Sequence, residues 1–216
     1  MALFRATPTL SEEVRAWRAG LRHVAGIDEA GRGPMAGPVV AAAVVLDPQW
    51  AAEWWSELRD SKQLTNGRRT ALAERLRAEA AYGVGTAGHD EIDADGLIEA
   101  TRRAMWRAVD ALPREPDLLL IDALSLTKGG YNGRRERSIV HGDALCVSIA
   151  AASVVAKDAR DRLMDGYDTE YPEYGFGHNR GYCTADHLSA LAEHGPCPIH
   201  RHSFAPVRDF LEQAGQ

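Results

Sequence analysis

Residues 24–46 read VAGIDEAGRGPMAGPVVAAAVVL, and this stretch decides the fold class of the chain. Two apolar, β-compatible runs flank a segment rich in glycine and proline. The pattern predicts buried strands over residues 24–30 and 39–46 that are joined by a glycine-rich turn. Because the turn leads into a second strand, it matches neither the dinucleotide-binding fingerprint nor the Walker pattern, both of which lead into a helix.

Helical and strand patterns alternate along the rest of the chain. Residues 66–80 place Leu72 and Leu76 at helical spacing with arginines and glutamates between them, which predicts an amphipathic helix. Further strands are predicted at residues 82–88 and 117–124, and further helices at residues 90–112, 146–171 and 184–194, the last of these being the final helix. Interleaved strands and helices without a long linker predict a single α/β domain.

The composition is that of an ordinary globular protein. The chain has 216 residues, of which 45% are hydrophobic and 26% charged, and this excludes a disordered, collagenous or solenoid protein. The longest apolar run, at residues 39–46, is far shorter than the ~18 residues of a membrane span. The N-terminal sequence lacks a secretory signal, and the three cysteines form no C-x-x-C pair. We expect a cytoplasmic monomer with no disulfide framework, no structural zinc site and no membrane contact.

The charge balance bears on the class of partner. A net charge of −6, from 25 basic and 31 acidic residues, argues against a protein that is basic over its whole surface. It does not exclude a nucleic-acid binder, because acidic residues gathered around cations also count as negative in that sum. Residues 128–137 carry four basic and one acidic side chain with three glycines, which predicts a mobile basic loop. A solvated surface loop with no function is the alternative interpretation.

Four carboxylates stand where apolar strands give way to loops. Asp28 and Glu29 follow VAGI, Asp122 follows DLLLI, and Asp143 follows a short β-branched stretch in IVHGD. An unpaired carboxylate on a buried strand is costly unless a cation or hydrogen bonds compensate it. Because sites in open α/β sheets form at the carboxyl ends of strands, these acids could converge on one or two hard divalent cations. Alternatively, each acid caps a strand end or serves in a turn.

Two further patterns have both a functional and a purely structural interpretation. The turn GRGPMAG at residues 31–37 could line a phosphate pocket with its backbone N–H groups, or could be only a tight hairpin turn. His194, His200 and His202 could form a metal cluster, but their irregular spacing favours ordinary hydrogen bonding in a loop. A Ser-His-Asp triad receives no support, because the chain has no G-x-S-x-G elbow.

Five sequence blocks in order resemble the ribonuclease HII family, and the match runs from about residue 20 to about residue 208. The blocks are IDEAGRGPMAGPVVAAAV, DSKQL, LLIDAL, HGD followed by AAASVVAKDARD, and GHNRGYCTADHLSALAEHGPCPIHRHSF. The resemblance implies an RNase H-like fold, with a central mixed sheet flanked by helices. It also implies a catalytic core at about residues 20–165 and a C-terminal helical region at about 166–210 that closes over nucleic acid.

The resemblance also implies roles for individual residues. The metal-binding acids of the family fall on Asp28, Glu29, Asp122 and Asp143, whereas Asp161 is a weaker candidate for the fourth ligand. The residues implied in substrate binding are Gly31, Arg32 and Gly33, which would read the ribose 2′-OH, Tyr182, which would pack beside that sugar, and Ser61 and Lys62, which would contact a phosphate. A solvated lysine on a loop is the alternative for Lys62. This chain has Ala150 where the family usually has a serine, which puts a hydroxyl near the site in doubt.

The activity implied by the resemblance is metal-dependent hydrolysis of the phosphodiester on the 5′ side of a ribonucleotide. The substrates would be RNA–DNA hybrids and duplex DNA with an embedded ribonucleotide, and two Mg²⁺ or Mn²⁺ ions would assist an in-line attack by water. Lys62, Lys128, Arg134 and Arg135 would contact phosphates. Two alternatives remain, a non-catalytic nucleic-acid binding module of the same fold and a metal-dependent nucleotide phosphatase.

Overall fold

A computed structural model describes residues 7–48, 53–58, 64–130 and 133–214 of the chain. Its centre is a five-stranded mixed sheet in the order β3-β2-β1-β4-β5. β1 pairs antiparallel with β2 and parallel with β4; β2–β3 is antiparallel and β4–β5 is parallel. The strands are β1 Val24–Ala30, β2 Val39–Val45, β3 Ala81–Ala87, β4 Leu118–Asp122 and β5 Glu136–Ile139. The predicted α/β class with a central mixed sheet is confirmed.

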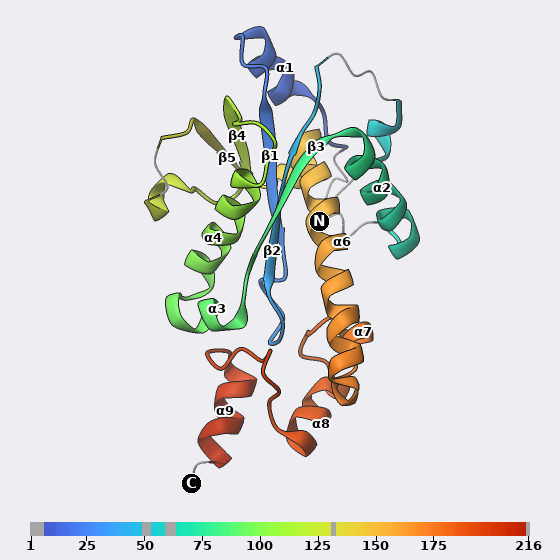
Figure 1. Ribbon diagram of the computed structural model, residues 1–216, viewed down its shortest axis with the longest axis vertical. Coiled ribbons are helices and arrows are strands. Elements are labelled where there is room, and N and C mark those ends of the chain that lie inside the picture. Colours follow the sequence, from blue (N-terminus) through green and yellow to red (C-terminus); the bar gives the residue numbers. More distant parts are fainter. Residues whose placement is uncertain (1–6, 49–52, 59–63, 131–132, 215–216) are drawn as a thin grey trace, which may run out of the picture.

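One long helix covers each face of the sheet, as Figure 1 shows. α4 (Leu97–Asp110) packs on β2 and β3, and α6 (Val147–Glu170) packs on β1 and β2 across the other face. α2 (Asn66–Glu79) lies beside α6 and also contacts β3. The apolar core therefore forms two layers, one under α4 and the other under α6.

Small residues let α6 pack closely on the sheet. A Cβ atom added to Gly26 of β1 would lie 2.1 Å from the carbonyl carbon of Ser148, so only glycine admits the helix at this distance. Ala150 is fully buried in the apolar layer between α6 and the sheet and does not line the site described below. The serine expected at that position would therefore add its hydroxyl to a packed layer.

Two helix predictions are wrong. The single helix predicted over residues 90–112 is two helices, α3 (His89–Asp95) and α4, because Gly96 between them has a φ of +84°. Glycine adopts this left-handed conformation readily and so separates two helices without a loop. The helix at α8 (Ala185–His194) is not the final one, because α9 (Ala205–Ala214) follows it. Pro206 lies in the first turn of α9, where proline is tolerated, although the sequence around it resembles a loop.

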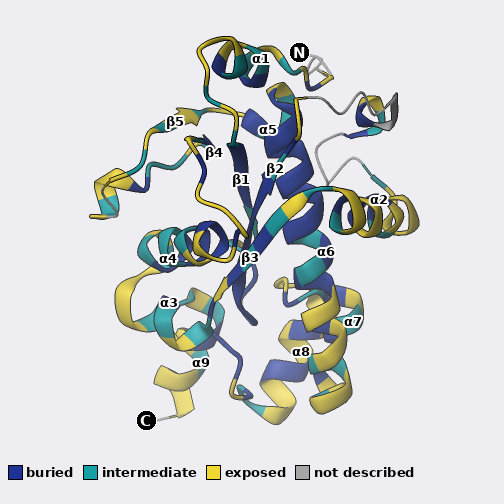
Figure 2. Ribbon diagram, turned by 45° about the horizontal axis from the view of Figure 1, so that its top comes forward, coloured by how far each residue is buried: buried dark blue, intermediate teal, exposed yellow. Residues whose placement is uncertain are grey.

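The remaining elements are short or peripheral. They are α1 (Ser11–Arg18), α5 (Gly142–Leu145), α7 (Phe176–Asn179) and the 3₁₀ turns η1 (Glu53–Glu57), η3 (Thr127–Gly129) and η4 (Pro172–Tyr174). Figure 2 shows α6 buried along the half nearest the sheet, whereas α8 and α9 expose much of their surface. Among the described residues, no helix is both long enough and apolar enough to cross a membrane.

The C-terminal region is fastened to the turn between β1 and β2. Ala36 of that turn forms a β-bridge with His200, and it belongs to an apolar cluster with Phe176 and Ile199. The Met35 N–H donates to the Gly181 carbonyl at 2.9 Å. Residues more than 140 positions apart thus meet behind the turn, and this contact holds the C-terminal region beside the carboxyl end of β1.

Candidate functional site

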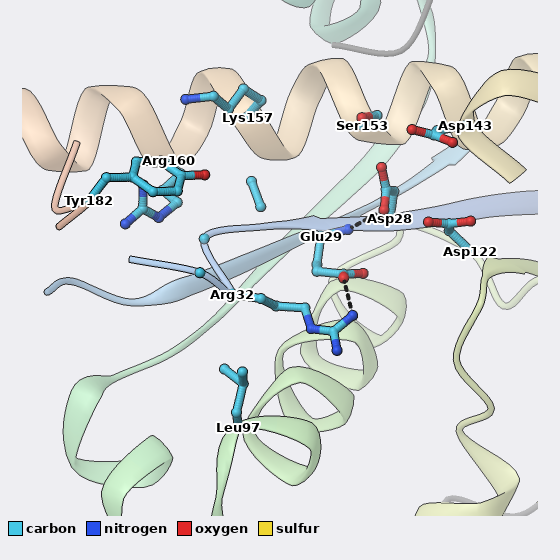
Figure 3. A pocket seen from close by; sticks show the side chains of 13 residues that line it. Asp28, Glu29, Arg32, Leu97, Asp122, Asp143, Ser153, Lys157, Arg160 and Tyr182 are labelled. Carbon is cyan, nitrogen blue, oxygen red and sulfur yellow. Dashed lines mark hydrogen bonds and ion pairs between the residues drawn. The ribbon is translucent and has the colours of Figure 1, made fainter. Parts of the chain in front are cut away.

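A cavity of about 440 Å³ opens at the carboxyl ends of β1 and β4. The four predicted acids, the three turn residues and the predicted tyrosine all line it: Asp28, Glu29, Asp122, Asp143, Gly31, Arg32, Gly33 and Tyr182. Figure 3 shows these side chains between α6 and the start of α4. Ser61 and Lys62 lie outside the described residues.

The strand register places Asp28 beside Asp122. β1 and β4 run parallel with Ile27 opposite Ile121, so the next residue of each strand is an aspartate and both side chains point to the same face. Glu29 points to the opposite face, as strand alternation requires, and Figure 3 shows it on the side away from α6. Both acids still line the cavity, because the sheet ends here and the cavity extends around its edge.

Asp143 reaches the cavity through a turn that is fixed to Asp122. The Gly142 N–H donates to Asp122 Oδ1 at 2.7 Å, which ties the end of β4 to the first residue of α5. Two non-glycine residues with positive φ flank this contact, Ala123 at +52° and His141 at +59°. Such conformations are strained and often mark functional sites. The strain here redirects the chain so that acids from two elements face one cavity.

Protein groups compensate the buried charge of Asp28 only in part. Burial raises the pKa of Asp28 well above its usual value, and the neighbouring charges of Glu29 and Asp122 raise it further. Hydrogen bonds from Ser153 and from the Glu29 N–H only partly oppose this rise in pKa. The Arg32 guanidinium pairs with Glu29 at 3.2 Å. Crowded, desolvated carboxylates are the donor set that a hard divalent cation needs.

The carboxylates surround the cavity without forming a closed ligand cluster. Within the part of the chain that the structure describes, no three His, Cys, Asp or Glu side chains are grouped as a ready-made metal site. An open arrangement is compatible with Mg²⁺, which is usually held by one or two carboxylates together with waters and substrate phosphates. The donor chemistry therefore fits divalent cations that bind together with a substrate.

Three residues on one face of α6 complete the cavity, and sequence reasoning did not select them. Ser153, Lys157 and Arg160 all line it. Their spacing of four and three residues is that of one helix face, which is the signal that could have found them. Burial lowers the pKa of Lys157, while an ion pair with Asp161 opposes this.

Asp161 itself belongs to a separate ion-pair network. It pairs with Arg69 at 2.8 Å and also with Lys157, and it does not line the cavity. This position is in keeping with the sequence analysis, in which Asp161 is the weaker candidate for the fourth metal ligand. It also gives the acid a structural role, because it joins α2 to α6.

The predicted basic loop lies away from the cavity. None of Lys128, Arg134 and Arg135 is among its lining residues. Arg134 pairs with Asp110 at 3.2 Å and with Glu115 at 3.1 Å, and its guanidinium lies 4.5 Å from the centre of the Trp106 ring. The charge of Arg134 is therefore engaged within the protein, and the expected phosphate contact receives no support from its position.

Tyr182 stands over the glycine turn. A Cβ atom added to Gly33 would lie 3.5 Å from Cε1 of the Tyr182 ring, so the ring and the turn are in contact. The residue is 46% exposed, so its ring is not part of the buried core. Gly181 approaches the Ala36 carbonyl so closely that an added Cβ would lie 2.4 Å from its oxygen. The tyrosine is thus held against the turn by its own backbone.

Two buried histidines anchor the backbone of Tyr182. The Cys197 N–H donates to His200 Nδ1 at 3.0 Å, which assigns the His200 proton to Nε2. His200 Nε2 then donates to His187 Nε2 at 3.1 Å, and His187 Nδ1 donates to the Tyr182 carbonyl at 2.8 Å. Burial lowers the pKa of His187 and lowers the pKa of His200 to about 4. The prediction that His200 forms ordinary hydrogen bonds is confirmed. These bonds run from Cys197 through His200 and His187 to the Tyr182 carbonyl.

Comparisons with known proteins agree with the fold and the site. The Ribonuclease HII family model matches residues 25–207. The ribonuclease HII of Desulfitobacterium hafniense (strain DSM 10664 / DCB-2) is 48% identical over 96% of this chain and 78% of its own length. The ribonuclease HII of Cereibacter sphaeroides (strain KD131 / KCTC 12085) is 48% identical over 95% of each chain.

Solved structures show the same architecture. Ribonuclease H2 from Pyrococcus horikoshii OT3 superimposes with a TM-score of 0.75 and 27% identity, covering 89% of this chain and 99% of that chain. Bst-RNase HIII in complex with Mn²⁺ has a TM-score of 0.68 at 20% identity over 99% of this chain and 77% of that chain, a likeness of fold. Because the family model and the relatives cover nearly the whole sequence, this chain belongs to the ribonuclease HII family, the metal-dependent type 2 ribonuclease H endonucleases.

Proposed function

We propose that this chain hydrolyses the phosphodiester on the 5′ side of a ribonucleotide and leaves a 5′-phosphate and a 3′-hydroxyl. The substrates are RNA–DNA hybrids and single ribonucleotides embedded in duplex DNA. The supporting observation is that one cavity carries carboxylates along one wall and the glycine turn with Tyr182 along another. A nucleotide between these walls would have its sugar at the turn and its phosphate at the acids. Since only the 2′-OH distinguishes the two sugars, this recognition needs no base contact.

The four acids are the proposed metal ligands. Asp28, Glu29, Asp122 and Asp143 would hold two divalent cations, Mg²⁺ or Mn²⁺, which when bound activate water and stabilise the leaving oxygen. The Mn²⁺ bound by Bst-RNase HIII supports this choice of ion. The crowding of charge around Asp28 supports it independently, because cations would relieve that repulsion.

The protein groups around the acids have separate tasks. Ser153 and the Gly142 N–H orient the carboxylates of Asp28 and Asp122 by hydrogen bonds. Lys157 adds a positive charge to the cavity wall, where it attracts a phosphate. Tyr182 places the ribose against the Gly31–Gly33 turn, whose backbone contacts the 2′-OH. Correct placement of the reacting group is the main contribution that such contacts make to the rate.

Other parts of the chain complete the proposal. The C-terminal region from about residue 166 closes over the duplex, which the cavity position of Tyr182 supports. Ser61 and Lys62 remain predicted phosphate contacts. The three cysteines are free thiols, two of them buried, which is in keeping with a reducing cytoplasm. We propose that the protein acts there as a monomer on nucleic acid.

The direct test uses a DNA duplex that carries one ribonucleotide, with an all-DNA duplex as its control. We expect cleavage on the 5′ side of the ribonucleotide with Mg²⁺ or Mn²⁺, none with EDTA and none on the control. End analysis should find a 5′-phosphate on the downstream fragment. Binding without cleavage in either metal would favour a non-catalytic module. Phosphate release from free nucleotides, uninhibited by the duplex, would favour a phosphatase.

A further inference from the structure

Two arginines are fully buried behind the glycine turn. Arg160 of α6 is 1% exposed and Arg201, which follows α8, is 0% exposed. Within the described residues, neither guanidinium forms an ion pair with a carboxylate. Buried arginine is rare unless it is paired, because the desolvation of its charge is costly. These two side chains therefore need a reason to be where they are.

Arg201 binds both ends of the turn through backbone carbonyl oxygens. Its Nη2 donates to the Gly31 carbonyl at 2.6 Å, and its Nη1 donates to the Arg32 carbonyl at 3.1 Å. Its Nε donates to the Gly37 carbonyl at 2.9 Å. The planar fork thus holds both ends of the turn at once, which a lysine could not do.

Arg160 binds the second half of the turn and the segment that carries the tyrosine. Its Nε donates to the Pro38 carbonyl at 3.1 Å and its Nη2 to the Ala36 carbonyl at 3.2 Å. Its Nη1 donates to the Arg180 carbonyl at 3.0 Å. One side chain therefore fixes the turn relative to the residues directly before Tyr182.

Gly31 of the turn makes room for the Arg160 side chain. A Cβ atom added to Gly31 would lie 2.1 Å from Nε of Arg160, and Gly31 has a φ of +97°. Position 31 therefore needs glycine for two reasons. A side chain would collide with Arg160, and the positive φ is a conformation that glycine adopts readily. The GRG sequence and the two distant arginines form one arrangement.

Carbonyl groups held from behind direct the N–H groups forward. In a trans peptide the N–H of the next residue points opposite to the carbonyl, and the described residues contain no cis bond. The Gly31 and Arg32 carbonyls point to Arg201, so the N–H groups of Arg32 and Gly33 point away from it. These two N–H groups donate to no acceptor in the part of the chain that the structure describes.

We infer that Arg160 and Arg201 are positioning residues that present the Arg32 and Gly33 N–H groups to the nucleotide and place two fixed positive charges behind them. The inference rests on the proposed function and assigns the sugar discrimination of that site to side chains that act through the backbone of the turn. The charges attract the phosphate of any duplex, whereas the fixed N–H direction selects the ribose. These two effects are separable by substitution.

Burial does not remove either charge at neutral pH. Desolvation lowers the pKa of Arg160 to about 10 and that of Arg201 to about 9. Both values lie above 7, so both groups remain protonated. The whole chain has a net charge of −6. Arg160 and Arg201, which form no ion pair with a carboxylate in the described residues, nevertheless place positive charge beside the cavity.

The test measures binding in an Asp122→Asn background, where cleavage does not consume the substrate. Affinity is compared for a duplex with one ribonucleotide and for an all-DNA duplex. Arg201→Lys keeps the charge and loses the fork, so we expect all-DNA affinity within about twofold and a preference for the ribonucleotide that falls about tenfold. Arg201→Met should lose the preference and also weaken both affinities. Arg162→Lys, an exposed change on α6, serves as the matched control.

A purely structural role gives a different result. If the arginines only stabilise the fold, both affinities fall together with the melting temperature, and Arg201→Lys retains the preference of its background. Arg160→Lys provides a second measurement if Arg201→Met does not fold, with the same expected loss of preference. If the Asp122→Asn background shows no preference at all, and the unmodified chain does not cleave the ribonucleotide duplex, the proposed function fails before this inference is reached.

Discussion

The two walls of the cavity solve opposite electrostatic problems. On the acidic wall, Asp28 is 5% exposed and is repelled by Glu29 and Asp122, with few protein donors to offset this. The arginine wall lies behind the glycine turn and consists of Arg160, which lines the cavity, and Arg201, which does not. Both are buried, yet each guanidinium donates to three backbone carbonyls. The acidic wall is incomplete without a cation, whereas the arginine wall is complete in the protein alone.

This difference separates what the metal does from what the fold does. Removing metal should change the acidic wall and leave the glycine turn in place, because the turn is held by protein donors. Conversely, a change at the turn should alter substrate choice while metal binding persists. The following predictions test that separation, from the largest expected effect to the smallest.

Asp122→Asn should reduce cleavage to background. It removes a carboxylate from the acidic wall while Asn can still accept the Gly142 N–H, so the local structure should remain. Steady-state cleavage of the ribonucleotide duplex with Mg²⁺ measures this loss, and a binding assay should find the duplex still bound through its phosphates. Turnover at the unmodified rate would remove Asp122 from the proposed metal site.

Tyr182→Ala should reduce cleavage at a lone ribonucleotide about 10²-fold, since a misplaced reacting group loses rate on that scale. An RNA–DNA hybrid offers many registers and more sugar contacts, so its cleavage should fall less. The ratio of the two rates is the quantity to measure. Equal losses on both substrates, together with a lower melting temperature, would mean that the tyrosine is only a packing residue.

Asp28→Asn should stabilise the metal-free protein at pH 7. A carboxyl whose pKa is raised in the folded state contributes stability below its unfolded pKa and loses it as pH rises through the folded value. Asn relieves that repulsion, so we expect a melting temperature a few degrees higher, with the difference vanishing near pH 4. Mg²⁺ should raise the melting temperature of the unmodified chain more than that of the variant. A lower melting temperature at pH 7 would contradict the description of the acidic wall.

Arg134→Ala should change cleavage less than about twofold. Its guanidinium is occupied by Asp110, Glu115 and the Trp106 ring, and it does not line the cavity. Partly exposed pairs of this kind contribute little, so stability should fall by only about 1 kcal/mol. A loss of duplex affinity with a smaller salt dependence would restore this arginine as a phosphate contact.

Sequence reasoning found the acidic wall because its signal is local. A carboxylate at the end of an apolar strand is costly wherever the strand lies, so Asp28 and Asp122 were conspicuous without knowledge of their partners. The paired strands of the hairpin were equally plain, because both runs are apolar and β-compatible. Asp28 and Glu29 face opposite sides of the sheet, as the alternation of side chains along a strand requires, and the cavity includes both because it extends around the sheet edge.

The arginine wall could not be predicted in the same way. Arg201 donates to carbonyl groups some 170 positions earlier in the chain. Every residue has a backbone carbonyl, so the sequence does not show which ones bind an arginine. A lone arginine beside histidines in HRHSF therefore resembles an ordinary loop residue. The break at Gly96 was missed for a related reason, since a single glycine within an amphipathic pattern is often tolerated.

The histidine chain behind Tyr182 has a consequence for acid tolerance. The Cys197 N–H fixes the direction of every proton along the chain, and a second proton on His187 would set two N–H groups against each other. The tyrosine anchor should therefore stay unchanged across physiological pH, although histidine usually titrates near 6.5. The unfolded chain has no such restriction and binds protons as the pH falls below about 6.5. For His200 alone this favours unfolding by about 3 kcal/mol once the pH reaches its folded pKa of about 4. The arrangement that keeps the tyrosine anchor unchanged with pH makes the fold sensitive to acid.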